Sequence, residues 1–210
     1  MLRIRIIYKK FGTIIFTSNL DLQKLWERVC RRAELNISYT SGFHPQARIQ
    51  QAAPLPLGFS SKKEIVDIWL EENDEISDIQ HKINSVLPNG LEILSIIYIS
   101  LQEPALQNRM VSSVYQIELP SGISKVLIEQ KINKILEEED LIISKRDKSI
   151  NLRERIENIE LLENNPNRHL SLIMHLSLRP ESTGRPDDVL KVMGVDPLDT
   201  KIERINLIYS

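Results

Sequence analysis

The sequence predicts an α+β protein made of two tandem ferredoxin-like units, each a split strand–helix–strand arrangement with an antiparallel sheet. Two observations lead to this prediction. Short β-branched runs alternate with amphipathic helical segments in both halves, and 210 residues are enough for two separate cores. The expected division is a basic N-terminal domain over residues 1–100, a linker over 101–110 and a C-terminal domain over 111–210.

The N-terminal half opens with β-branched runs at residues 2–9 and 13–17, separated by KKFG. This pattern predicts a hairpin with Gly12 in the turn. From Ser18 onward, apolar residues recur at helical steps, and Ser18 with Asp21 fits a capping box. The remaining expected elements of this half are strands over 48–53, 64–70 and 91–99 and a helix over 76–87.

Residues 101–110 show no firm periodicity, which is typical of a linker. The elements expected after it are strands over 111–119, 141–145, 156–162, 169–178 and 202–209, and helices over 123–138 and 186–193. Pro186 suits a first helical turn, and Gly194 suits the end of that helix.

The formal net charge of −2 hides an uneven distribution. Residues 1–50 contain nine Lys or Arg and three Asp or Glu, so they carry +6 against −8 for the rest of the chain. A positive surface near the N-terminus is typical of proteins that bind polyanions, although folding can also scatter such charges over several faces.

The helix expected after Ser18 concentrates its cations on one side. Taken at 100° per residue, an arc opposite the apolar face contains Lys24, Arg28, Arg31 and Arg32. Guanidinium groups form forked hydrogen bonds with phosphate oxygens, so this stripe favours phosphate binding. The alternative is a solvated helix face in which Glu27 pairs with Arg31. Arg3 and Arg5 share one face of the first strand and either extend the patch or form a solvated sheet edge.

The segment SGFHPQAR places an aromatic ring, an imidazole and a guanidinium close together, in Phe43, His44 and Arg48. Pro45 favours an extended backbone at His44, which suits base stacking or an anion contact. The alternative is a turn whose Phe43 anchors into the core. The proline-rich run that follows, through Gly58, predicts a stiff connection with no reactive groups of its own.

Several function classes are excluded or disfavoured by the sequence. It has no glycine-rich phosphate loop, nucleophile elbow or His-Glu-x-x-His zinc site, and its single cysteine, Cys30, builds neither a disulfide nor a cysteine-rich cluster. We therefore expect no cofactor and no metal bound by this chain. No apolar run is long enough to cross a bilayer and the first residues do not read as a signal peptide, so we expect a cytoplasmic protein with no membrane partner.

The run from Phe16 to Leu70 resembles the radical-SAM-linked domain family of unknown function, a domain appended to, or encoded beside, cobalamin-binding radical-SAM proteins. GRPDDVLKVMG near the end of the chain extends the resemblance. Where that family usually has Ser-His-Leu-Asp, this chain has Ser18-Asn19-Leu20-Asp21, and it lacks the family's frequent second His-Pro after Phe43-His44-Pro45. The resemblance implies a partner that is a radical-SAM protein or a ribonuclease E/G-type enzyme.

Three hypotheses for function follow. The first is a non-catalytic auxiliary domain that binds RNA, or an RNA-associated substrate, for a radical-SAM or RNA-processing partner. The second is a protein-interaction domain that docks onto a radical-SAM enzyme through the proline-rich loop or a sheet edge. The third is an RNA-processing enzyme in which His44 and Asp21 act as an acid–base pair.

Overall fold

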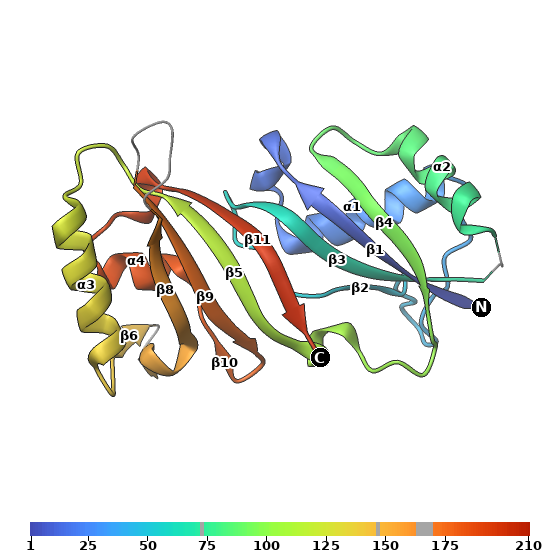
Figure 1. Cartoon of the computed structure of the whole chain (residues 1–210). Helices are drawn as coiled ribbons and strands as arrows, with labels where there is room; N and C mark the ends of the chain where they lie inside the picture. The colour runs from blue at the N-terminus through green and yellow to red at the C-terminus, as the bar shows by residue number, and fades with distance from the viewer. Residues whose placement is uncertain (72–73, 146–147, 163–169) are drawn as a thin grey trace. The chain divides into compact units, whose positions relative to one another are not determined.

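A computed structural model describes residues 1–71, 74–145, 148–162 and 170–210. The chain divides into two compact units, Met1–Arg109 and Met110–Ser210, each of which we describe by itself. Both combine helices with antiparallel strands, so the predicted α+β class is confirmed (Figure 1).

Unit 1 contains a four-stranded antiparallel sheet in the order β2-β3-β1-β4. One helix connects β1 to β2 and another connects β3 to β4. The bounds of these elements are β1 Leu2–Lys10, α1 Asn19–Arg32, β2 Ile49–Gln51, β3 Ser60–Leu70, α2 Ile76–Val86 and β4 Leu91–Ile99.

The two helices of unit 1 pack on one face of its sheet. Alternate residues of the central strands, such as Ile4, Ile6 and Ile68, are fully buried and share one hydrophobic core with the inner faces of α1 and α2. Because strand side chains alternate between faces, the neighbouring residues Arg3, Arg5 and Asp67 fall on the opposite face of the sheet.

The predicted hairpin of residues 2–9 and 13–17 is wrong. Residues Gly12–Phe16 form a short 3-10 helix, because β1 is a central strand that already pairs with β3 and β4 along its two edges. Ile14 is buried and packs near Gly90, whose positive φ of 97° and close contact with the carbonyl oxygen of Phe11 leave no room for a side chain. The apolar run 13–17 therefore reflects burial and not strand pairing.

Unit 2 contains a second antiparallel sheet in the order β8-β9-β5-β11, with the short β10 also paired to β9. The strands and helices that precede β8 are β5 Met110–Glu118, α3 Lys125–Glu137, β6 Ile142–Lys145 and β7 Lys148–Asn151. Those that follow are β8 Ile156–Leu162, β9 Ser171–Arg179, β10 Ser182–Thr183, α4 Pro186–Val192 and β11 Lys201–Tyr209. β6 and β7 form a separate hairpin.

Residues 101–109, expected as a linker with residue 110, fold against unit 1. Arg3 donates hydrogen bonds from Nη1 to the carbonyl oxygen of Glu103 (2.7 Å) and from Nη2 to that of Pro104 (3.1 Å). A short 3-10 helix, Leu106–Arg109, follows, with Leu106 fully buried, and Met110 already begins β5. The unit boundary therefore falls at 109/110.

Two strands have no counterpart in the sequence prediction, β7 and β10, and the strand expected over 169–178 begins with His169, which lies outside the described residues. Among the described residues, no helix is long and apolar enough to cross a membrane.

Candidate nucleic-acid interface

Helix α1 is amphipathic and well capped. Its inner face buries Leu22, Trp26, Val29 and Cys30, and the Trp26 ring meets the Tyr8 ring edge-on at a centroid distance of 4.9 Å. The backbone N–H of Asp21 donates to Ser18 Oγ (3.1 Å), as the predicted capping box requires. The buried side fixes the rotation of the helix and so fixes which residues face outward.

The outward side of α1 carries the predicted basic residues. We call them the α1 stripe: Lys24, Arg28, Arg31 and Arg32, all exposed. Arg31 Nη2 contacts Glu27 Oε1 at 3.1 Å, an exposed pair with little effect on stability. Within the described part of the chain, Lys24, Arg28 and Arg32 have no ion pair or side-chain hydrogen bond. Three of the four cations are thus unneutralised by neighbours in that part.

The SGFHP segment forms the tip of an exposed loop. Below the tip, Thr40 N–H donates to the carbonyl oxygen of Gln46 (2.9 Å), and Gln46 N–H donates to Thr40 Oγ1 (3.0 Å). Phe43 is 102% exposed and His44 is also exposed, so the alternative in which Phe43 anchors into the core is wrong. We call Phe43 and His44 the loop tip.

One contact joins the base of this loop to α1. Tyr39, which pairs with Ala47 across the loop, places its hydroxyl 3.5 Å from Glu27 Oε1, the same oxygen that Arg31 contacts. The loop base therefore lies beside the α1 stripe at Arg31.

Arg48, the remaining predicted site residue, lies on the other face of the sheet. Its guanidinium carbon is 5.0 Å from the centroid of the Trp69 ring, and Trp69 alternates along β3 with the core residues Ile68 and Leu70. Arg48 therefore sits on the sheet face away from α1. The structure brings Arg31 and the loop base together but separates Arg48 from the α1 stripe.

A buried ionic cluster on the same sheet face was missed by sequence reasoning. Asp67, fully buried, accepts hydrogen bonds from Arg3 Nε (3.0 Å) and Nη2 (2.6 Å) and from Arg5 Nε (2.8 Å) and Nη2 (2.9 Å). Arg3 also stacks on Trp69 at 4.7 Å. Neither alternative for Arg3 and Arg5, a surface patch or a solvated edge, is correct. The signal was available: two arginines alternate with isoleucines in the first strand, and one aspartate interrupts the apolar run IVDIWL.

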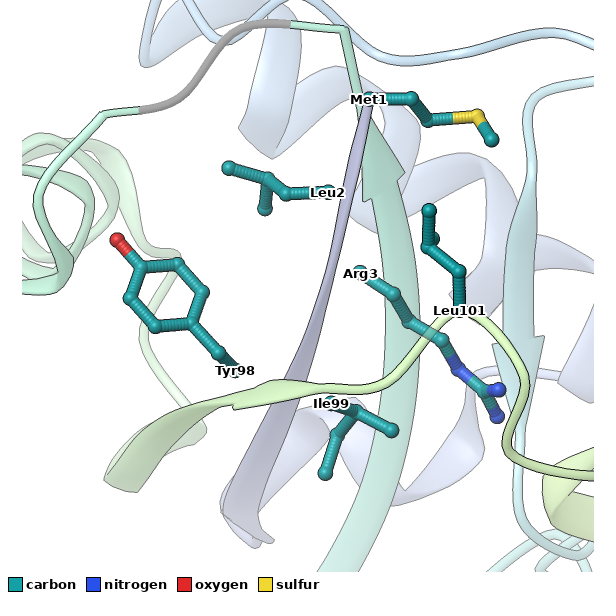
Figure 2. A pocket seen from close by; sticks show the side chains of 6 residues that line it. All are labelled: Met1, Leu2, Arg3, Tyr98, Ile99 and Leu101. Carbon is teal, nitrogen blue, oxygen red and sulfur yellow. The ribbon is translucent and has the colours of Figure 1, made fainter.

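A cavity of about 350 Å³ opens where β1 begins and β4 ends (Figure 2). Its lining residues are Met1, Leu2, Arg3, Tyr98, Ile99 and Leu101. Figure 2 shows Leu2 and Tyr98 on one side of β1, with Arg3 pointing to the other. The Arg3 Nε, Nη1 and Nη2 groups all donate to protein acceptors, so the cavity wall is mainly apolar. None of the predicted site residues lines it.

In unit 2, the residues around the start of α4 form ion pairs with one another. Arg185 donates from Nε to Asp187 Oδ1 and from Nη2 to Asp187 Oδ2, both at 2.9 Å. Burial alone raises the pKa of Asp187, but the hydrogen bonds and charge of Arg185 outweigh it and hold that pKa below its usual range. Lys145 pairs with the neighbouring Asp188. These pairs account for GRPDD as a structural motif.

The described residues contain no group of three or more His, Cys, Asp or Glu arranged to hold a metal ion. Cys30 is buried, and burial raises the pKa of its thiol to about 12, which keeps it protonated near neutral pH.

Residues 3–186 match the model of a family described as "uncharacterized protein conserved in bacteria (DUF2344)". The chain belongs to this family. The family's matched segment includes the α1 stripe, the loop tip and the Arg3–Asp67–Arg5 cluster. A search of proteins with curated functions found no match.

Among solved structures, a chain of a Cbf5-Nop10-Gar1 complex is similar to this family member with a TM-score of 0.50 and 9% identity, over 96% of this chain and 48% of that one. A chain of an H/ACA RNP bound to a substrate RNA containing 2'-deoxyuridine has a TM-score of 0.47 and 8% identity, over 95% of this chain and 47% of that one. This chain spans about half the length of each. The likeness to the first is one of fold.

Proposed function

We propose that this protein is a non-catalytic auxiliary module that binds RNA, or an RNA-associated substrate, through the α1 stripe and the loop tip. The observation that carries the proposal is Phe43, a large aromatic side chain that is entirely exposed at the end of a loop. A fully exposed ring contributes nothing to the core but leaves its whole apolar surface available for binding, and unstacked bases are natural partners for such a ring.

The electrostatics of the neighbouring helix agree with this proposal. Lys24, Arg28 and Arg32 are exposed and have no partner within the described residues, and Arg31 lies beside the loop base. Phosphate contacts supply most of the non-specific affinity for nucleic acids, whereas stacking and base-edge contacts at the loop tip add selectivity for single strands. RNA and DNA share this chemistry, so both are included in the test below.

The resemblance of residues 16–70 to the radical-SAM-linked domain family supports a choice of partner enzyme. We propose that the module serves a radical-SAM or RNA-processing enzyme and presents RNA to it. We also propose that both units are ferredoxin-like. The orders β4-β1-β3-β2 and β11-β5-β9-β8, each with helices after its first and third main strands, support this assignment.

A second candidate function, docking onto a partner protein, is favoured by an exposed apolar pair. Leu57, in the proline-rich loop, is 60% exposed and Phe16 is 70% exposed. Gly58 N–H donates to the carbonyl oxygen of Ile15 (3.1 Å), which holds the two side chains in neighbouring segments. This pair fits a small apolar contact with a protein, and it uses residues that the RNA proposal leaves unused.

The enzyme hypothesis receives no such support. The carboxylate of Asp21 accepts a hydrogen bond from Ser18 Oγ (2.7 Å) in the cap of α1, whereas the loop that carries His44 contacts the helix at Glu27, six residues further along. A carboxylate used in a helix cap at that distance does not orient the His44 imidazole.

The test is fluorescence anisotropy of labelled single-stranded RNA and DNA 12-mers at several salt concentrations. We expect binding that weakens steeply with salt, and we expect the Arg28→Ala/Arg32→Ala double variant to bind at least tenfold more weakly. The matched control is Lys148→Ala/Lys191→Ala, which removes two exposed cations from unit 2. Equal losses in the two double variants, or no binding by the parent protein, would show that the α1 stripe is not an RNA interface.

A further inference from the structure

We infer that unit 1 has a second phosphate subsite, formed by Arg48 on Trp69, which binds the same nucleic-acid strand as the α1 stripe from the opposite face of the sheet. This inference rests on the proposed function and deepens it. It identifies the ligand as a single strand that passes around the loop tip from one face of the unit to the other.

The backbone fixes Arg48 at the edge of the sheet. Its N–H donates to the carbonyl oxygen of Ser38 (2.9 Å), and its carbonyl oxygen accepts from Trp69 N–H (3.0 Å). The side chain lies over the Trp69 ring, with Nη1 3.2 Å from the sulfur of Met1. Within the described residues, no carboxylate pairs with Arg48, and its Nε and Nη2 groups have no acceptor.

The Trp69 platform is itself held rigidly. Arg3 stacks on the same ring at 4.7 Å, and Arg3 is fixed by two hydrogen bonds to the buried Asp67. Asp67 also binds Arg5, so its carboxylate is fully occupied inside the cluster. Arg48 is thus an oriented guanidinium fork with free donors, the arrangement that binds phosphate or carboxylate oxygens with little loss of side-chain entropy.

The loop between Tyr39 and Ala47 connects the two faces of the unit 1 sheet. Its first side, at Tyr39, contacts Glu27 on α1, and its second side leads directly into Arg48 on the other face of the sheet. The bare ring of Phe43 lies at the tip between them. A strand with one base stacked on Phe43 therefore sends its phosphates in one direction to the α1 stripe and in the other to Arg48. An acidic protein segment would satisfy the cations but would leave the exposed ring without a stacking partner, so we favour a polynucleotide.

The experiment measures binding of single-stranded RNA of 2, 4, 8 and 12 nucleotides to the full chain, for the parent protein, Arg48→Gln and Arg28→Ala/Arg32→Ala. We expect Arg48→Gln to weaken binding only above a threshold length, and to reduce the slope of log K against log salt by about 0.7 for the 12-mer, the value for one lost phosphate contact. Arg48→Lys, which keeps the charge but loses the fork, is expected to keep the slope and lose part of the affinity. Urea unfolding of Arg48→Gln verifies that it folds, and Arg48→Lys supplies the test if it does not.

The outcomes separate the two proposals. If the α1 double variant weakens binding but Arg48→Gln and Arg48→Lys change neither affinity nor slope at any length, the subsite is wrong and the proposed function stands. If no oligonucleotide binds, the proposed function fails. If polyglutamate displaces the 12-mer as well as unlabelled RNA does, and Arg48→Gln weakens polyglutamate binding equally, the ligand is an acidic protein segment and the inference is overturned.

Discussion

Arg3 and Asp67, on neighbouring strands of unit 1, form a buried ion pair with two hydrogen bonds, from Nε (3.0 Å) and Nη2 (2.6 Å) of the arginine to one carboxylate oxygen. The same carboxylate also binds Arg5, so it accepts hydrogen bonds from two guanidinium groups that are each 2% exposed. The cluster lies under the Trp69 ring and supports the sheet face that carries Arg48.

Asp67→Ala is expected to destabilise the protein by about 3–5 kcal/mol, because it removes the buried carboxylate that binds two buried guanidinium groups. Urea unfolding followed by circular dichroism measures the change. The control is Glu92→Ala, which removes an exposed cross-strand partner of Lys9 in the same unit and is expected to cost less than about 1 kcal/mol. If Asp67→Ala lowers the free energy of unfolding no more than Glu92→Ala does, the cluster has no structural role.

Phe43→Ala separates binding from stability. Because the ring makes no contribution to the core, we expect the free energy of unfolding to change by less than about 0.5 kcal/mol. Binding of single-stranded RNA is expected to weaken by about 1–3 kcal/mol, the usual value of one stacked base. Anisotropy titration of both proteins measures this. Phe43→Trp, which keeps a stacking surface, should retain binding, and a Phe43→Ala protein with parental affinity would remove the ring from the interface.

Cys30 reports on unfolding of unit 1. Burial raises the pKa of its thiol to about 12, so alkylation by iodoacetamide at pH 8 is expected only when the core opens. The rate of modification, followed by mass spectrometry, should rise with urea in parallel with unfolding. Ser77→Cys adds an exposed thiol on α2 that should react at once under native conditions. Rapid native labelling of Cys30 would contradict its placement on the buried face of α1.

Asp187 is expected to make stability depend on acid pH. Its pKa is below the usual range in the folded state, so its contribution is fully present above the unfolded value of about 3.9 and is lost as pH falls through the folded pKa. The difference in unfolding free energy between the parent protein and Asp187→Asn should therefore be constant from pH 5 to 8 and shrink below about pH 4. Urea denaturation at a series of pH values measures this difference in unfolding free energy. A difference that grows on acidification would contradict a lowered pKa for Asp187 in the folded state.

The sequence was informative where local patterns decide structure. The 3.6-residue period and the Ser18–Asp21 capping box predicted α1 and its outward cations. The β-branched runs predicted the bounds of β4 and the end of β3, although β3 begins four residues earlier than predicted, at Ser60. It failed where pairing is long-range. The run 13–17 has the composition of a strand, but both edges of β1 are taken by strands more than 50 residues away, so it becomes a 3-10 helix.

The same reason explains the errors at the site. Arg3 and Arg5 have the spacing of an exposed strand face, and the carboxylate that binds both of them in the buried cluster, Asp67, is more than 60 residues away in the sequence. Arg48 is close in sequence to Phe43, but the loop returns to the opposite face of the sheet before Arg48 is reached. The outward position of the α1 stripe, by contrast, follows from the local helix period and was predicted, whereas the exposure of Phe43 was one of two alternatives that the sequence left open.

Ultraviolet crosslinking of a 4-thiouridine RNA 12-mer to the full chain, followed by trypsin digestion and mass spectrometry, tests the central claim most directly. Trypsin cuts after Arg32 and Arg48 and releases residues 33–48 as one peptide that contains the loop tip. We predict that the crosslinked nucleotide is found on this peptide, at or next to Phe43, and that excess unlabelled RNA removes it. Crosslinks confined to peptides of unit 2, with none on residues 33–48, would contradict the account.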